Sequence, residues 1–177
     1  MATNSDSAPP PRERELVITR TFDAPRELVW KAFTESDRLA QWWGPKDFTM
    51  VVRTLGVRPG GVFHYAMRSP GGQVMWGKFV FHEIQAPERL VFVSSFADEE
   101  SNTIRAPFSP TWPLEILNTV TLSESGGNTT VTFRGGPINA SEDERDAFWS
   151  SQESVQQGFA GTFDQLAAYL AAEAKGQ

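Results

Sequence analysis

The sequence contains no cysteine and only two histidines among its 177 residues. Without cysteine the chain can form no disulfide, no thiolate-bound zinc or iron–sulfur centre, and no cysteine nucleophile. The two histidines, His64 and His82, leave little scope for a site in which several histidines hold a metal ion. We therefore expect neither a metal nor another cofactor.

Positive charge is also scarce, because 16 Lys and Arg residues stand against 22 Asp and Glu residues, a formal net charge of -6. Proteins that bind the phosphate backbone of nucleic acids present a basic face, so we expect no nucleic-acid partner. No apolar run approaches the roughly 18–20 residues of a membrane span, and the N-terminus lacks the apolar segment of a secretory signal. These absences predict a cytoplasmic protein with no membrane partner.

The first 14 residues are polar and include three consecutive prolines. Such a composition buries little apolar surface and favours an extended chain, so residues 1–14 are predicted to be a disordered tail. The remaining segment, residues 15–173, has the usual length of one domain. We accordingly predict a single domain that follows a tail.

Aromatic residues are plentiful, with 13 Phe, 6 Trp and 2 Tyr, together 12% of the chain. Residues 15–22 alternate between apolar and polar side chains, which predicts a strand. Two short helices are expected next, the first after Asp23-Ala24-Pro25 and the second ending at Gly44-Pro45. Alternating segments between turn residues then predict six antiparallel strands, at residues 48–55, 61–68, 73–84, 89–96, 114–123 and 128–134.

A long helix is predicted at the C-terminus. Ser141 and Glu144 have the spacing of a capping box, in which each side chain bonds to the backbone amide of the other residue. Gly158 and Gly161 inside this helix would permit the close approach of another backbone, or a bend. Apolar residues recur at steps of three, four or seven over about eight turns, which predicts one continuous helix: Phe148, Val155, Phe159, Phe163, Leu166 and Leu170.

This order of elements predicts the fold class α+β. A curved antiparallel sheet of about seven strands is expected to wrap around the long C-terminal helix, because an apolar helix face needs a concave apolar partner. The two short helices would follow the first strand and, together with segment 97–113, form the mouth of a cavity under the long helix. The proline-rich segment 97–113 is too long for a simple turn, and its Phe108 and Trp112 predict that it packs on the domain, at the mouth of a cavity under the helix.

Several short blocks of the sequence resemble one protein family. They are Asp23-Ala24-Pro25, residues 29–34, residues 39–45, Pro59-Gly60-Gly61, Gly77 with Glu83-Ile84, residues 87–92, and Gly158-Phe159 with Leu166, Ala167, Tyr169 and Leu170. These blocks are similar to the family of homologues of the activator of the heat-shock-protein-90 ATPase, in its bacterial single-domain type. That family lies in the helix-grip superfamily with START lipid-transfer domains, polyketide cyclases and the birch-pollen allergen. The resemblance implies a helix-grip fold, and none of the blocks is a catalytic motif.

Histidine and arginine are the candidates for chemistry on the predicted strands. His64 could act as a general base, since histidine titrates near neutrality, whereas neighbours such as His82 and Glu83 point to opposite faces of a strand. No nucleophile or supporting carboxylate stands at a telling spacing, so a histidine on a solvated or half-buried strand face is the favoured interpretation. One arginine could hold a ligand's carboxylate or phosphate, although pairing with surface acids is the commoner role: Arg53, Arg68, Arg105 and Arg134.

Aromatic residues gather on the faces that the sheet and the helix turn toward each other. They predict either a ligand cavity, which is typically apolar with few polar groups, or a filled core. Of the adjacent Trp42 and Trp43, either one packs inward and the other covers the rim of the cavity, or both cap the core. Tyr65 or an arginine would orient a polar group of the ligand. The predicted ligand-binding residues are Phe33, Trp42, Trp43, Phe63, Tyr65, Met67, Phe79, Phe92, Trp112, Phe159 and Phe163.

Our first hypothesis is a non-enzymatic module that binds a small hydrophobic or amphipathic molecule in a cavity between the sheet and the C-terminal helix. A second hypothesis is an enzyme of the cyclase or hydrolase kind that uses His64 or Tyr65 as acid or base. A third is a protein-interaction module like the co-chaperone relative. Trp76 lies on the opposite strand face from the predicted cavity, and this face is a candidate contact for a homodimer.

Overall fold

A computed structural model describes residues 15–175 of the chain. The predicted tail at residues 1–14 lies outside the described residues. The strands are β1 (Leu16–Phe22), β2 (Thr49–Leu55), β3 (Val62–Arg68), β4 (Val74–Gln85), β5 (Arg89–Ala97), β6 (Thr103–Ile104), β7 (Glu115–Ser125) and β8 (Asn128–Ile138). The helices are α1 (Arg26–Thr34), α2 (Ser36–Trp42), α3 (Glu142–Ser150) and α4 (Gln152–Lys175).

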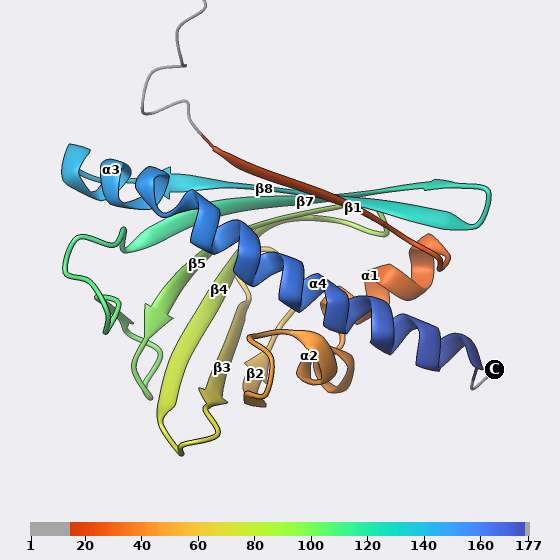
Figure 1. Ribbon diagram of the computed structural model, residues 1–177, viewed down its shortest axis with the longest axis horizontal. Coiled ribbons are helices and arrows are strands. Elements are labelled where there is room, and N and C mark those ends of the chain that lie inside the picture. Colours follow the sequence, from red (N-terminus) through yellow and green to blue (C-terminus); the bar gives the residue numbers. More distant parts are fainter. Residues whose placement is uncertain (1–14, 176–177) are drawn as a thin grey trace, which may run out of the picture.

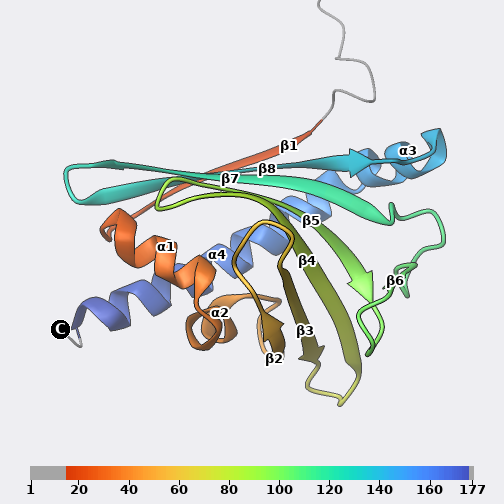
Figure 2. The same cartoon turned by 180° about the vertical axis from the view of Figure 1, so that it is seen from behind.

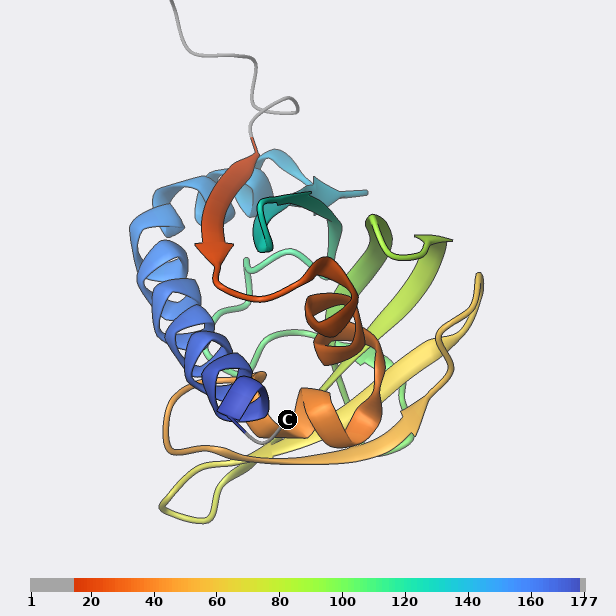
Figure 3. The ribbon, with the colours of Figure 1, turned by 90° about the vertical axis from the view of Figure 1, so that its right-hand side faces the viewer.

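The strands form one eight-stranded sheet with the order β1-β8-β7-β5-β4-β3-β2, and the short β6 pairs with β5 alone. Neighbouring strands are antiparallel throughout. The sheet curves around α4, which runs diagonally across its concave face (Figures 1 and 3). Seen from behind, α1 and α2 lie near the C-terminal end of α4, and β6 and α3 lie at the opposite end (Figure 2). The predicted α+β helix-grip fold is therefore confirmed.

The predicted strands match the observed ones to within a few residues, with two differences. The segment 97–113 contains an eighth strand, β6, because Thr103 and Ile104 pair with the end of β5. Strand β8 continues to Ile138, four residues beyond the predicted end at 134, where it stays paired with the first residues of β7. Both additions lie at the end of the sheet that carries α3 (Figure 2).

The prediction of one continuous C-terminal helix is wrong, because Ser151 separates α3 from α4. Periodicity did not reveal the break, since Phe148 and Val155 are seven residues apart and stay on one stripe. The Ser150 hydroxyl donates to the carbonyls of Asp146 and Ala147, a local bond that competes with regular helix geometry. The predicted capping box of Ser141 and Glu144 is present at the start of α3.

The two glycines of α4 do not serve a close approach of another backbone, which corrects one of the two roles expected for them. A Cβ atom added to Gly158 or to Gly161 would meet no heavy atom within 4 Å. Helix α4 passes through both positions without interruption. The C-terminal helical region is therefore divided at Ser151 and not at either glycine.

The C-terminal half of α4 packs tightly on α1, α2 and the adjoining sheet. We call this region the packed end, and its residues are Phe33, Leu39, Trp42, Phe163, Leu166 and Leu170, all at most 6% exposed. The Trp42 indole nitrogen donates to the Ala32 carbonyl at 2.9 Å. The Thr162 hydroxyl and the Gln165 amide both donate to the Gly44 carbonyl, at 3.1 and 2.8 Å. The first bond joins α2 to α1, and the other two fix α4 to the segment just after α2.

Candidate functional site

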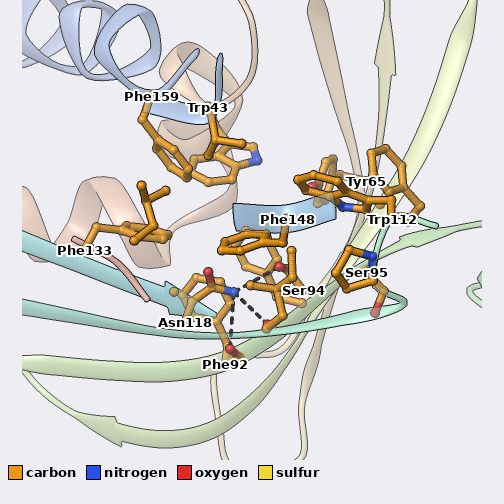
Figure 4. Close-up of a pocket in the computed structure, with 18 of the residues that line it drawn as sticks. Trp43, Tyr65, Phe92, Ser94, Ser95, Trp112, Asn118, Phe133, Phe148 and Phe159 are labelled. Atoms are coloured by element: carbon orange, nitrogen blue, oxygen red, sulfur yellow. Dashed lines mark hydrogen bonds between the residues drawn. The ribbon is translucent and has the colours of Figure 1, made fainter. Parts of the chain in front are cut away.

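A cavity of about 210 Å³ lies under the N-terminal half of α4, between this helix, α3 and the concave face of the sheet (Figure 4). We call this region the open end. A cavity needs only roughly 10–15 Å³ to admit one water molecule, so this one has room for an organic molecule. Its lining residues are Leu16, Trp43, Tyr65, Met67, Trp76, Gly77, Phe79, Phe92, Ser94, Ser95, Phe96, Trp112, Pro113, Ile116, Asn118, Phe133, Gly135, Phe148, Val155 and Phe159.

The floor of the cavity is built from strand positions that face α4. Because side chains alternate along a strand, the register places Tyr65 beside Gly77, and Asn118 beside Gly135, on the same inner face. A Cβ atom on Gly77 would lie 2.7 Å from the Tyr65 hydroxyl oxygen, and one on Gly135 would lie 3.0 Å from Asn118 Oδ1. The absence of a side chain at these two glycines therefore makes room for the two polar residues beside them.

Aromatic rings enclose the cavity on the helix side. The Trp43 ring meets Phe79 edge-on at 5.3 Å and Phe159 at 6.2 Å. Phe159 in turn lies 4.7 Å from Phe133 on β8. Trp43 and Phe159 lie close together on the helix side of the cavity, across from Asn118 on the sheet (Figure 4). These contacts hold the rings along the wall, where they leave the cavity open between them.

The segment 97–113 packs against the open end, as its aromatic residues predicted. Ring contacts run from Phe96 to Phe108 at 5.5 Å, from Phe108 to Trp112 at 5.6 Å, and from Trp112 to Phe148 at 5.6 Å. Arg105 donates to the Trp112 carbonyl at 3.1 Å and pairs with Glu144 on α3. This segment therefore joins α3 at the border of the cavity, where Trp112 and Phe148 both line it. Helices α1 and α2, which were also expected at the mouth, contribute no lining residue, and only Trp43, just after α2, borders the cavity.

Three polar side chains on the inner face define the chemistry of the cavity. Burial raises the pKa of Tyr65 to about 12, against an opposing polar interaction with the Trp43 side chain. Asn118 is 5% exposed, and its Nδ2 donates to Ser94 Oγ at 2.9 Å and to the Ile116 carbonyl at 3.0 Å. None of the described residues that line the cavity carries a formal charge.

The structure divides the predicted ligand-binding residues into two groups. Seven of them line the cavity: Trp43, Tyr65, Met67, Phe79, Phe92, Trp112 and Phe159. The other four, Phe33, Trp42, Phe63 and Phe163, lie in the core beside it and are at most 6% exposed. Of the two alternatives for the tryptophan pair, the first describes the structure, because Trp42 packs inward while Trp43 borders the cavity. A role in ligand binding stays a prediction for all eleven.

The two histidines and the candidate arginines lie away from the cavity. His64 is on the outer face of β3, where its Nε2 donates to the Asp98 carbonyl at 3.0 Å and its ring lies 4.9 Å from that of Trp76. It is 4% exposed, so it is buried, not half-buried as predicted. The arginines do not line the cavity: Arg53 lies over the Trp76 ring, Arg134 pairs with Glu15, Arg105 pairs with Glu144, and Arg68 is exposed.

The sequence reasoning missed the polar and small residues of the floor, above all Asn118, Ser94 and Gly135. A signal for Asn118 was present, since an amide stands at an inward position between the apolar Ile116 and Val120 of an alternating strand. Ser94 and Gly135 gave no such signal, because serine and glycine are also common at solvated or bulged strand positions.

No group of three or more His, Asp or Glu side chains within residues 15–175 is placed to hold a metal ion. No helix in the same range has the length and apolar character to cross a bilayer.

Comparisons with known proteins agree with the fold. The sequence profile of the family described as Activator of Hsp90 ATPase homolog 1-like protein matches residues 23–171. A crystal structure of a Mycobacterium smegmatis protein, 26% identical in sequence, has a TM-score of 0.73 and covers 90% of this chain and 92% of its own. A solution structure from Arthrobacter aurescens, 25% identical, has a TM-score of 0.77 and covers 93% of this chain and 90% of its own. No curated protein matches the chain significantly.

Proposed function

We propose that this chain, which belongs to the family of Activator of Hsp90 ATPase homolog 1-like proteins, binds a small hydrophobic or amphipathic molecule in the cavity under α4. The observation that carries the proposal is the cavity itself, about 210 Å³ in a domain whose packed end is otherwise solidly filled. An apolar protein cavity of about 150 Å³ is large enough for benzene. A molecule of one or two rings, or a short branched chain, suits the observed volume.

The chemical character of the lining supports the same class of ligand. Its walls are mostly aromatic, with Trp43, Trp112 and Phe159 among them, and its floor offers the polar groups of Tyr65 and Asn118. Small-molecule sites typically combine an apolar lining with a few placed polar groups that orient the ligand. A cavity without charged side chains favours neutral ligands, because an ion loses its hydration there without gaining a partner.

The alternative of an enzyme that uses His64 or Tyr65 has less support. His64 lies on the other face of the sheet from the cavity, where it bonds to Asp98, so it cannot reach a molecule bound under α4. The pKa of Tyr65, raised by burial to about 12, keeps the phenol protonated near neutral pH. In this form Tyr65 can donate a hydrogen bond to a ligand, but it is a poor general base.

The alternative of a protein-interaction module or homodimer rests on the strand face that carries Trp76, although Trp76, predicted to lie away from the cavity, also borders it. The Trp76 ring there packs at a tilt against His64 and lies under Arg53, with the guanidinium carbon 5.1 Å from the ring centroid. The chain's own side chains therefore cover part of this surface. The cavity, in contrast, holds free volume between its lining side chains, which makes small-molecule binding the better-supported function.

A filling substitution tests the proposal. In Val155→Trp the larger ring would project from α4 into the cavity that Val155 lines. In the matched control Val17→Trp, the same ring is added on the outer face of β1, where Val17 is 43% exposed. We expect calorimetric titration with naphthalene to show saturable binding to the wild type and the control, and binding at least about tenfold weaker to Val155→Trp. Equal binding by both variants, or none by the wild type, would contradict the proposal.

A further inference from the structure

Asn118 is the one amide side chain that lines the cavity among the described residues, and its orientation is fixed by its neighbours. Its Nδ2 group lies 3.0 Å from the Ile116 carbonyl, 3.5 Å from the Phe92 carbonyl and 2.9 Å from Ser94 Oγ. Backbone carbonyl oxygens only accept hydrogen bonds, so the NH₂ group must be the half of the amide that faces them. The carbonyl oxygen Oδ1 therefore points the other way (Figure 4).

Asn118 Oδ1 accepts no hydrogen bond from the residues that the structure describes. It nevertheless belongs to a residue that is only 5% exposed and that lines the cavity. Gly135 lies opposite, and a methyl group there would stand 3.0 Å from Oδ1. The sheet thus presents a hydrogen-bond acceptor to the cavity, and the glycine beside it places no side chain of its own in front of this acceptor.

The other groups of the cavity decide which ligand atoms can use this acceptor. Asn118 Oδ1 attracts a donor such as a hydroxyl or phenol O–H and repels the oxygens of a carboxylate. No lysine or arginine lines the cavity to compensate a negative charge. An ionised ligand would therefore lose its hydration without a counter-charge, whereas a neutral donor would lose little and gain a buried hydrogen bond.

We infer that the cavity selects neutral molecules with one hydroxyl group on an otherwise apolar skeleton, and that Asn118 is the residue that recognises this hydroxyl. The hydroxyl donates to Oδ1 at the floor, and the apolar part of the ligand lies against Trp43 and Phe159 on the helix side. The bonds to Ser94 and Ile116 already fix the orientation of the Asn118 amide, so the amide need not rotate when the ligand binds. This inference rests on the proposed function and names the class of ligand.

Three probes with one common skeleton test the inference: naphthalene, 2-naphthol and 2-naphthoate, titrated by calorimetry near pH 7. We expect 2-naphthol to bind the wild type roughly two- to tenfold more tightly than naphthalene, as a buried hydrogen bond would give. We expect 2-naphthoate to bind at least about tenfold more weakly than 2-naphthol, because its charge is buried without a partner. Equal affinity for all three, or a preference for 2-naphthoate, would overturn the inference while leaving the proposed function standing.

Two variants localise the effect to Asn118 Oδ1. Asn118→Leu removes the acceptor at similar volume, and Gly135→Ala leaves Asn118 in place but sets a methyl group in front of it. In both, the advantage of 2-naphthol over naphthalene should disappear, while naphthalene still binds. Gly158→Ala is the matched control, since its methyl group would meet nothing within 4 Å. If one variant fails to fold, the other still gives the ratio of the affinities for 2-naphthol and naphthalene. A ratio equal to that of the wild type in either folded variant overturns the role of Asn118. Failure of every probe to bind the wild type would contradict the proposed function and this inference together.

Discussion

Toward its C-terminus, α4 rests on α1 and α2 through side chains that fill the space between them. Trp42 is 1% exposed, and its ring meets Phe33 edge-on at 4.9 Å. Phe163 is completely buried and meets Phe22 edge-on at 6.0 Å. Polar groups in this region, such as the Trp42 indole nitrogen and the Thr162 hydroxyl, are bonded to backbone carbonyls. The packed end is therefore filled by buried side chains, and these two polar groups already have partners.

Toward its N-terminus, α4 lies over a floor of equally aromatic strands but does not fill the space above it. Phe79 and Phe92 stack at 4.2 Å, and Phe133 packs on Phe159 at 4.7 Å. Between them the inward positions hold small residues, among them Ser94 and Gly135. The cavity of about 210 Å³ lies over these positions.

The difference between the two ends shows that aromatic content alone does not distinguish a core from a binding site. Both ends use Trp and Phe, and the residues opposite the rings decide whether space is left. Large aliphatic residues such as Leu166 and Leu170 stand opposite the rings at the packed end, whereas glycine, serine and asparagine do so at the open end. The open end has accordingly kept its volume and its polar acceptor.

The strongest test of this difference is to replace a tryptophan by alanine at each end of the domain and to compare the losses of stability. Trp42→Ala should lower the free energy of unfolding by about 3–5 kcal/mol, because it removes a fully buried ring and leaves a cavity. Trp112→Ala at the open end should lower it by only about 1 kcal/mol, since this ring is partly exposed and already borders free space. Urea denaturation of both variants measures the difference. Equal losses would show that the two ends are packed alike.

A pH titration of stability tests how dry the floor of the cavity is. The pKa of Tyr65 is raised by burial from 10.0 to about 12, so between these values the folded state holds more protons than the unfolded state. The free energy of unfolding should therefore fall as the pH rises from 10 to 12, by about 3 kcal/mol in total. Below pH 10, Tyr65 is protonated in both states and should contribute no pH dependence.

Tyr65→Phe is the control for this titration. It keeps the ring but lacks the ionisable group, so the difference in stability between wild type and variant should follow the predicted curve. The other described tyrosine, Tyr169, is present in both proteins and cancels in the difference. A flat difference between pH 10 and 12 would mean that water reaches the Tyr65 hydroxyl in the folded protein.

A pair of glycine substitutions sharpens the claim that small floor residues are needed. Gly77→Ala puts a methyl group 2.7 Å from the Tyr65 hydroxyl oxygen and 2.8 Å from the neighbouring ring carbon. We expect it to lower the free energy of unfolding by about 1–3 kcal/mol through overpacking. Gly161→Ala in α4, where a methyl group meets nothing within 4 Å, should instead raise it by about 0.5–1 kcal/mol through helix propensity. Thermal unfolding of both variants decides, and a stable Gly77→Ala protein would contradict the claim.

Much of the fold was predictable because its signals are local. Residues 15–22 alternate strictly, and the pair Gly126-Gly127, with φ of 62° and 85°, marks the turn between β7 and β8. The spacing of Ser141 and Glu144 predicted the start of α3. The break at Ser151 could not be predicted in this way, because the apolar stripe continues across it and the serine bonds that accompany it leave no trace in periodicity.

The cavity was predictable only in part. Alternation placed Tyr65 and Phe79 on the inner face, but it placed Phe63 there as well, and Phe63 lies in the core, stacked on Tyr65 at 4.6 Å. Which inward residues border free space depends on where α1 and α2 pack against α4, and this is a non-local property. The orientation of Asn118 was hidden for the same reason, because it depends in part on Phe92 and Ser94 of the neighbouring strand β5, besides the Ile116 carbonyl of its own strand.

The most direct test of the account is a crystal structure of the protein grown with 2-naphthol. We predict that the molecule lies in the cavity under α4, with its rings against Trp43 and Phe159 and its oxygen within hydrogen-bond distance of Asn118 Oδ1. The account would be contradicted by a structure in which Trp112 and Phe148 fill the cavity, or in which 2-naphthol occupies another site and leaves Asn118 without contact.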